Sequence, residues 1–203
     1  MVAANRRFTT WMITGTALLL ALGVMLPLVF HAFPLGGRIF LPMHLPVFIA
    51  GLVLGPLSGL IVGAGSPILS ALITGRPTVP YMIPMLLELA TYGVVAGALR
   101  PALERAFRRG SGGTAPRGSG ASGASRSPGS YWTPCLVISL VVAMVAGRIV
   151  WLAVVVWLAP VIGITAREVA VAMGALGAGW IGMAIQIALI PPIVRAIERV
   201  RNP

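Results

Sequence analysis

Long apolar stretches separated by short polar segments dominate this chain of 203 residues. A helix that crosses a bilayer needs about 20 predominantly apolar residues, and five stretches are that long or longer. They are residues 10–30, 44–74, 79–99, 131–160 and 169–194. The pattern predicts an all-α integral membrane protein.

The stretch 44–74 is too long for a single crossing. One helix of that length would extend about 46 Å, against about 30 Å of hydrocarbon. Gly55 and Pro56 lie near its middle, and proline favours the first position of a new helix. The sequence therefore predicts a turn there, so that this stretch crosses twice and the chain forms six helices.

Glycines recur every four residues through the same stretch, at Gly51, Gly55, Gly59 and Gly63. Such a stripe lets helices approach closely. A turn at Pro56 splits it into two pairs, which we expect to let two short helices pack closely.

Charge is scarce and almost all positive. The chain is 58% hydrophobic and 9% charged, with 15 Arg, no Lys, no Asp and four Glu, for a net charge of +11. These values exclude a soluble globular enzyme, a disordered chain and a collagen-like chain. Nucleic-acid binding explains the charge poorly, because basic residues that flank membrane spans give the same excess.

Most arginines fall into three clusters, which we expect to share the cytoplasmic side. The clusters are Arg6 and Arg7; Arg100, Arg105, Arg108, Arg109, Arg117 and Arg126; and Arg195, Arg199 and Arg201. Arg38, Arg76 and Arg167 are then outside, and Arg148 is buried. This requires an even number of crossings before Arg100, so six helices with cytoplasmic termini are predicted.

The charged and polar segment at residues 110–130 reads GSGGTAPRGSGASGASRSPGS, the composition of a flexible linker. It divides one membrane domain into helices one to four (1–109) and helices five and six (131–203). The two parts do not resemble each other, which disfavours a transporter built from inverted repeats.

Two ionisable residues, Glu88 and Arg148, lie inside apolar spans at comparable predicted depths. A charge there is costly unless it is paired or solvated, and it marks a functional site by default. One interpretation makes them each other's partners, and the other places both in an outward-facing ligand pocket. The two are compatible, because a ligand can bridge or replace such a pair.

Gln186 and His44 are weaker candidates. Gln186 follows the small residues Gly174, Ala178 and Gly182, and it bonds either to a neighbouring helix or to a ligand. His44 is either a loop or interfacial residue, or it touches a ligand beneath a folded outer loop. Two histidines without Asp cannot supply a usual metal site, and we expect no metal or cofactor.

Common catalytic motifs are absent from the sequence. There is no GxxxxGK[ST] loop, HExxH or GxSxG. Energy from ATP must therefore come from a partner.

Three segments resemble the substrate-binding S components of energy-coupling factor (ECF) vitamin transporters. They are LPMHLPVFIAGLVLGPLSGLIVGAGSPILSALITGRP, MLLELATYGVVAGAL and AMVAGRI around Arg148. The resemblance covers nearly the whole chain and implies six helices, a scaffold membrane subunit and two ATPase subunits as partners. Ala17 and Ala21 match the AxxxA motif with which the first helix of that family meets the scaffold. Glu88, Tyr92 and Arg148 fall in the region that binds the vitamin.

The leading hypothesis is therefore a non-enzymatic subunit of a bacterial cytoplasmic membrane importer that captures a small water-soluble vitamin. Because a guanidinium matches a carboxylate, we expect a carboxylate-bearing vitamin such as nicotinate or pantothenate. The alternatives are a small membrane enzyme acting on lipid or peptide, with Glu88 and His44 as acid or base, and a self-sufficient carrier or channel.

Overall fold

The computed structural model describes residues 2–31, 43–111, 132–158, 161 and 166–201, and within these ranges it contains helices and no strands. The elements are α1 (Val2–His31), α3 (His44–Ile49), the π-helix η1 (Ala50–Leu54), α4 (Pro56–Thr74), α5 (Val79–Ser111), α6 (Trp132–Leu158) and α7 (Ala166–Arg201). The linker expected at 110–130 lies, from residue 112 on, outside the described residues, as does the loop at 32–42. The all-α prediction is confirmed for the described part.

Five described helices are long and apolar enough to cross a bilayer, so this is a multi-pass membrane protein. Their spans are Thr10–Val29, Pro56–Thr74, Tyr81–Arg109, Trp132–Trp157 and Ile181–Arg201. The remaining apolar helix, His44–Leu54, is shorter. At 1.5 Å per residue it rises only about 16 Å, roughly half of the hydrocarbon thickness.

The turn predicted near Gly55 and Pro56 is confirmed. Gly55 has φ 103° and ψ 175°, a backbone conformation that suits glycine, and Pro56 is the first residue of α4. The Gly55 N–H donates to the carbonyls of Ala50 and Gly51, at 3.2 and 3.0 Å, and so closes η1. The long stretch 44–74 is thus two helices.

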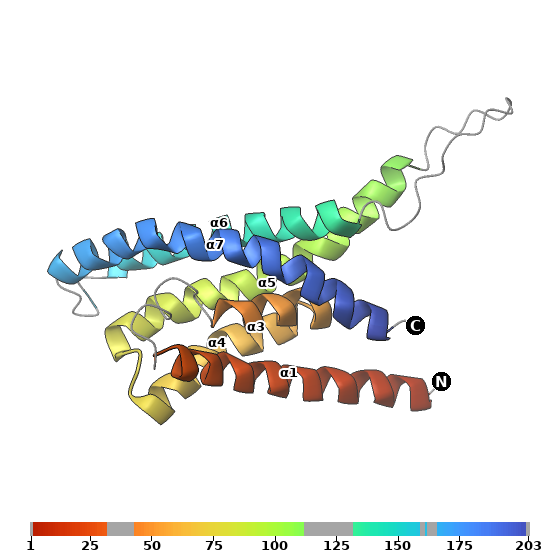
Figure 1. Cartoon of the computed structure of the whole chain (residues 1–203), viewed down its shortest axis with the longest axis horizontal. Helices are drawn as coiled ribbons and strands as arrows, with labels where there is room; N and C mark the ends of the chain where they lie inside the picture. The colour runs from red at the N-terminus through yellow and green to blue at the C-terminus, as the bar shows by residue number, and fades with distance from the viewer. Residues whose placement is uncertain (1, 32–42, 112–131, 159–160, 162–165, 202–203) are drawn as a thin grey trace, which may run out of the picture.

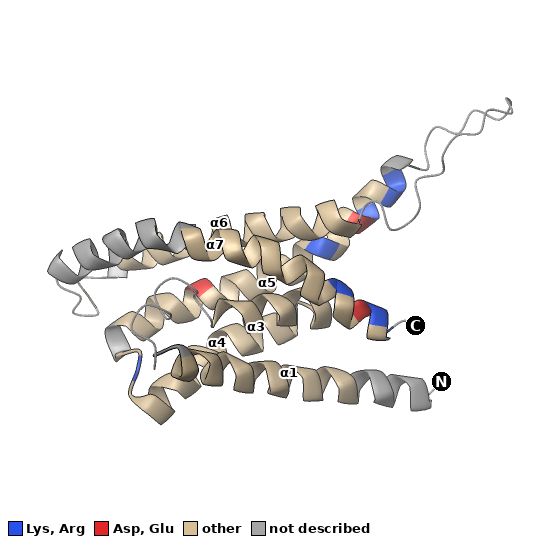
Figure 2. Ribbon diagram, viewed as in Figure 1, with Lys and Arg blue, Asp and Glu red and all other residues tan. Residues whose placement is uncertain are grey.

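Both chain ends lie at the same end of the helix bundle (Figure 1). The last turns of α5 and α7 lie there too, whereas the turn between α4 and α5 lies at the opposite end. We call the end of the bundle that holds both chain ends the terminal end. The described basic residues gather mainly there (Figure 2), as expected if the α5 and α7 arginine clusters share one side.

Glycines bring α4 and η1 into backbone contact with α5. A Cβ atom on Gly59 would lie 2.5 Å from the carbonyl oxygen of Gly93, and one on Gly63 would lie 2.4 Å from that of Leu89. On η1, a Cβ atom on Gly51 would also meet Gly93, at 2.4 Å. The two halves of the glycine stripe therefore share one partner, α5, which the sequence did not identify.

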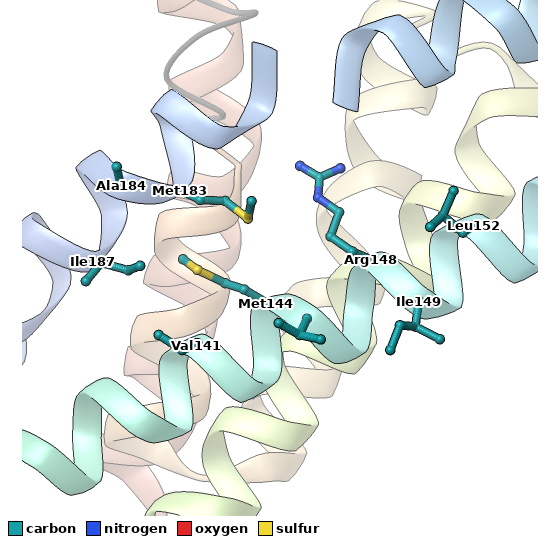
Figure 3. A pocket seen from close by; sticks show the side chains of 9 residues that line it. Val141, Met144, Arg148, Ile149, Leu152, Met183, Ala184 and Ile187 are labelled. Atoms are coloured by element: carbon teal, nitrogen blue, oxygen red, sulfur yellow. The ribbon is translucent and has the colours of Figure 1, made fainter. Parts of the chain in front are cut away.

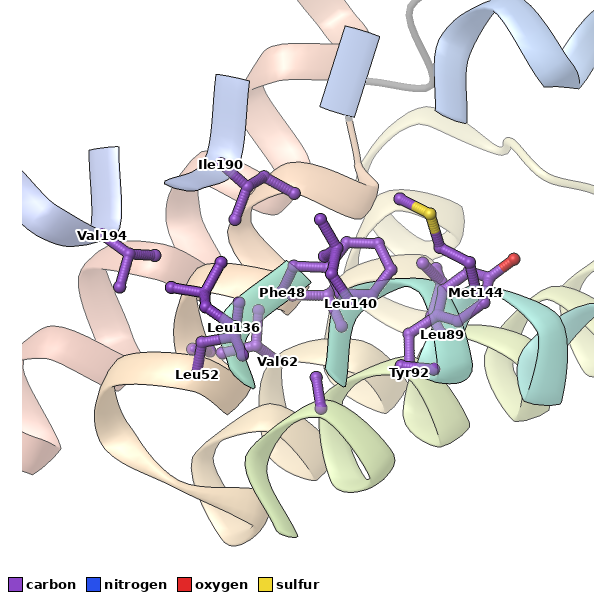
Figure 4. Close-up of a cluster of buried hydrophobic side chains, with 14 of the residues drawn as sticks. Phe48, Leu52, Val62, Leu89, Tyr92, Leu136, Leu140, Met144, Ile190 and Val194 are labelled. Carbon is purple, nitrogen blue, oxygen red and sulfur yellow. The ribbon is translucent and has the colours of Figure 1, made fainter. Parts of the chain in front are cut away.

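The hydrophobic core joins α3, η1, α4 and α5 to α6 and α7 (Figure 4). Its buried side chains include Phe48, Leu52, Val62, Leu89, Tyr92, Leu136, Leu140, Met144, Ile190 and Val194. This packing holds α5 against α6 and fixes the position of Tyr92.

Arg100 connects four helices near the terminal end. Its side chain is buried and donates to the Leu52 carbonyl of η1 at 2.9 Å, a carbonyl that Pro56 cannot bond because proline lacks an N–H. It also pairs with Glu104 at 3.1 Å and with Glu198 of α7 at 2.6 Å. Trp132 of α6 donates to the same Glu198 carboxylate. Arg100 thus has a structural role.

Candidate functional site

An ion pair between α5 and α6 forms the centre of the candidate site. Arg148 Nη1 lies 3.1 Å from Glu88 Oε1. Glu88 is 4% exposed, and the Arg148 side chain is 19% exposed. The structure therefore brings together the two ionisable residues that the sequence singled out, and each compensates the cost of burying the other.

Tyr92 lies one helical turn after Glu88 on α5 and contacts the same carboxylate oxygen as Arg148. The Tyr92 hydroxyl donates to Glu88 Oε1 at 2.6 Å. The Tyr92 ring packs on α6 at Gly147, where a Cβ atom would come within 2.2 Å of the ring carbon Cε1. Gly147 thus allows α6 to approach closely enough for its neighbour Arg148 to reach Glu88.

His44 and Phe48 of α3 also pack near the Tyr92 ring. Their ring centroids lie 5.3 and 5.0 Å from that of Tyr92, at interplanar angles of 46° and 30°. His44 is 5% exposed and begins α3, so it lies inside the bundle and not in a loop. The expected cluster of Glu88, Arg148, Tyr92 and His44 is therefore contiguous.

A cavity of about 470 Å³ lies between α6 and α7 (Figure 3). Its lining residues are Val141, Met144, Val145, Arg148, Ile149, Leu152, Met183, Ala184 and Ile187. Arg148 is the one charged residue among them, and the guanidinium extends into the space between the two helices (Figure 3). The volume falls within the range of small-molecule sites.

Gln186 lies on α7 next to Ile187 of the cavity wall. It is 2% exposed, but it does not line the cavity. The structure thus places it in the neighbouring helix packing.

The sequence analysis missed Phe48, Gly147, Met144 and Met183. Phe48 lies four residues after His44 and so on the same helix face, which is a signal that could have found it. Gly147 lies directly before Arg148. Met144 and Met183 are ordinary apolar residues of apolar helices, and only the packing identifies them.

The arrangement can bind an anion. A guanidinium has five N–H groups on three nitrogens, of which Nη1 faces Glu88, and it can accommodate a carboxylate bidentately. Within the described residues, no group of three or more His, Cys, Asp or Glu side chains could hold a metal ion. The described side chains of the site offer an ion pair and a hydrogen bond, between Arg148 and Glu88 and between Tyr92 and Glu88.

Ala17 and Ala21 lie on a different surface. Both are exposed on α1, on a face that also presents Leu18 and Met25, which are 61% and 59% exposed. The opposite face of α1 contacts α4 through a hydrogen bond of 2.9 Å from Thr16 to Ser58. The face with both alanines is therefore open to lipid or to another protein.

Comparison with known proteins gives one match. A family model described as "ECF transporter, substrate-specific component" matches residues 12–194, which include every element of the fold except the outermost turns. No curated protein and no solved structure matches the chain.

Proposed function

The chain belongs to the substrate-specific components of ECF transporters, and on this basis we propose that it captures a carboxylate-bearing vitamin or micronutrient for an ATP-driven importer. Members of this family are substrate-binding subunits of transporters and not enzymes. The proposal places the chain in the bacterial cytoplasmic membrane, with six helices and cytoplasmic termini.

The position of Arg148 on the cavity wall is the observation that supports the proposed substrate class. Arg148 is a permanent cation on the wall of a cavity of about 470 Å³, and its described partner there is Glu88. A water-soluble anion of vitamin size can share or replace that contact. The Glu88–Arg148 pair lowers the cost of the empty state and leaves N–H donors for a ligand.

Energy for import has to come from other subunits. The sequence lacks the phosphate-binding loop of ATPases, and it contains no lysine to complete one. We propose that a scaffold membrane subunit and two ATPase subunits supply the energy and that this chain supplies the specificity.

The face of α1 around Ala17 and Ala21 is the proposed docking surface for the scaffold. Small residues four apart let another helix approach closely. Both alanines are exposed, and exposed apolar side chains surround them. An open apolar surface of this kind suits a second membrane helix.

Replacing both alanines tests this function. Ala17→Trp combined with Ala21→Trp should abolish co-purification with the scaffold subunit and uptake, because the bulky rings hold the helices several ångströms apart. Substrate binding by the isolated chain should persist. Ala153→Trp, at an exposed position of α6, is the control and should leave assembly intact. Assembly and uptake that survive in the double variant would show that α1 is not the docking surface.

A further inference from the structure

We infer that the cavity between α6 and α7 selects a monocarboxylate whose remaining body is apolar, held with its carboxylate at Arg148. This inference rests on the proposed function and narrows its substrate class. It also differs from the expectation of nicotinate or pantothenate, because the cavity-lining residues that the structure describes offer no side chain besides Arg148 to a second polar group.

The described walls of the cavity are almost entirely apolar. Of the nine lining residues in the described part of the chain, eight are Val, Met, Ile, Leu or Ala, and Arg148 is the ninth. Along these eight described residues, a hydroxyl or amide on the ligand would leave water without finding a side-chain partner, which disfavours polar ligands. An aliphatic or aromatic body would instead bury apolar surface, and the flexible side chains of Met144 and Met183 can adjust to its shape.

The placement of Arg148 within the cavity gives the ligand an orientation. On α6, Val141, Met144 and Val145 precede Arg148, and Val141 lies about 10 Å before it along the helix axis. Met183 and Ile187 of α7 face this same part of the cavity (Figure 3). Ile149 and Leu152 of α6 line the cavity on the other side of Arg148, but the described α7 residues of the wall lie on the side of Val141 (Figure 3). The apolar body should therefore extend from Arg148 toward the terminal end.

The depth of Arg148 identifies the source of the ligand. Arg148 precedes Trp157, the last residue of the α6 span, by nine residues, or about 14 Å. A fatty acid in the bilayer keeps its carboxylate at the interface with water, where the charge is solvated. The depth of Arg148 therefore favours a carboxylate carried by a small molecule that enters from solution.

Titration calorimetry on the full chain, purified in detergent, tests the inference with matched probes. We expect 3-phenylpropanoate to bind at least tenfold more tightly than its primary amide, which lacks the charge. 3-Phenylpropanoate should likewise bind more tightly than pantothenate, which has the charge but a polar body. Arg148→Ala should lose at least tenfold in affinity, and Arg148→Lys should recover part of this loss, because an ammonium lacks the planar fork.

A second pair of variants tests the cavity without touching a charge. Ala184 lines the cavity, whereas Ala188, one turn further along α7, is exposed and does not. Ala184→Phe should fill the space and abolish binding of 3-phenylpropanoate, and Ala188→Phe should preserve it. This pair remains decisive if the Arg148 variants fail to fold. Equal binding by both variants would overturn the inference.

The remaining outcomes separate this inference from the proposed function. If pantothenate or the amide binds more tightly than 3-phenylpropanoate, the inferred selectivity for an apolar monocarboxylate would be overturned. The chain would still be a substrate-binding subunit. If oleate in nanodiscs displaces the probe from the wild type but not from Arg148→Ala, the claim that the ligand enters from solution would be overturned. Failure to assemble with a scaffold subunit or to support uptake would count against the proposed function itself.

Discussion

At the scale of single residues, the proposed function makes Glu88 and a bound carboxylate competitors for one guanidinium. Glu88→Gln removes the competing anion but leaves the Arg148 charge uncompensated in the empty protein. We expect a lower melting temperature without ligand and roughly tenfold tighter binding of 3-phenylpropanoate, equivalent to about 1.4 kcal/mol. Calorimetry and thermal unfolding in detergent measure both effects.

Tyr92→Phe is the matched control for Glu88→Gln. It removes the 2.6 Å hydrogen bond to Glu88 and keeps both charges. Its affinity for the carboxylate should therefore stay within about threefold of the wild type, by the modest net value of one hydrogen bond. An unchanged affinity in Glu88→Gln would mean that the pair is only structural.

The sequence identified the charged part of the site and not its walls. Glu88 and Arg148 stand out because ionisable residues are rare and costly in apolar spans. Tyr92 was found only through the family resemblance. Met144 and Met183 could not be found, since an apolar side chain in an apolar helix does not reveal whether it faces lipid, core or cavity.

At the scale of elements, the contact between α4 and α5 depends on glycine at particular positions. A Cβ atom on Gly59 would collide with the backbone of Gly93, which cannot move alone, whereas one on Gly65 would meet only the end of the Leu20 side chain. Gly59→Ala should therefore push the helices apart and lower the melting temperature by several degrees, a cost of about 1–3 kcal/mol.

Gly65→Ala is the control on the same helix. The Leu20 side chain can rotate, and alanine has the higher helix propensity, by about 1 kcal/mol. Its melting temperature should be equal to or above that of the wild type. Equal destabilisation by both substitutions would argue that the close contact with α5 is not what restricts Gly59.

The elements show what local pattern can and cannot predict. Excess length, a proline and the arginine count together located the turn at Gly55. They did not predict η1, which depends on the Gly55 N–H, or Arg100 as the donor to the Leu52 carbonyl. Nor did the glycine stripe reveal its partner, because small residues show that a helix is close and not which helix it is.

At the scale of the whole molecule, the shared position of both termini predicts sidedness. Single cysteines introduced into a Cys135→Ala background should react with an impermeant reagent from outside at position 37 or 165, but not at position 115. The reason is that the α5 and α7 arginine clusters should stay on the cytoplasmic side. Labelling of position 115 in intact cells would contradict the arrangement of six helices.

Mass spectrometry of small molecules released from the purified chain tests the central claim most directly. A substrate-capture subunit should carry one small monocarboxylate in near-stoichiometric amount, and the Arg148→Ala variant, purified in parallel, should carry far less. The opposite result would be a folded wild-type chain that carries no small molecule and binds none from a panel of vitamins. That result would contradict substrate capture.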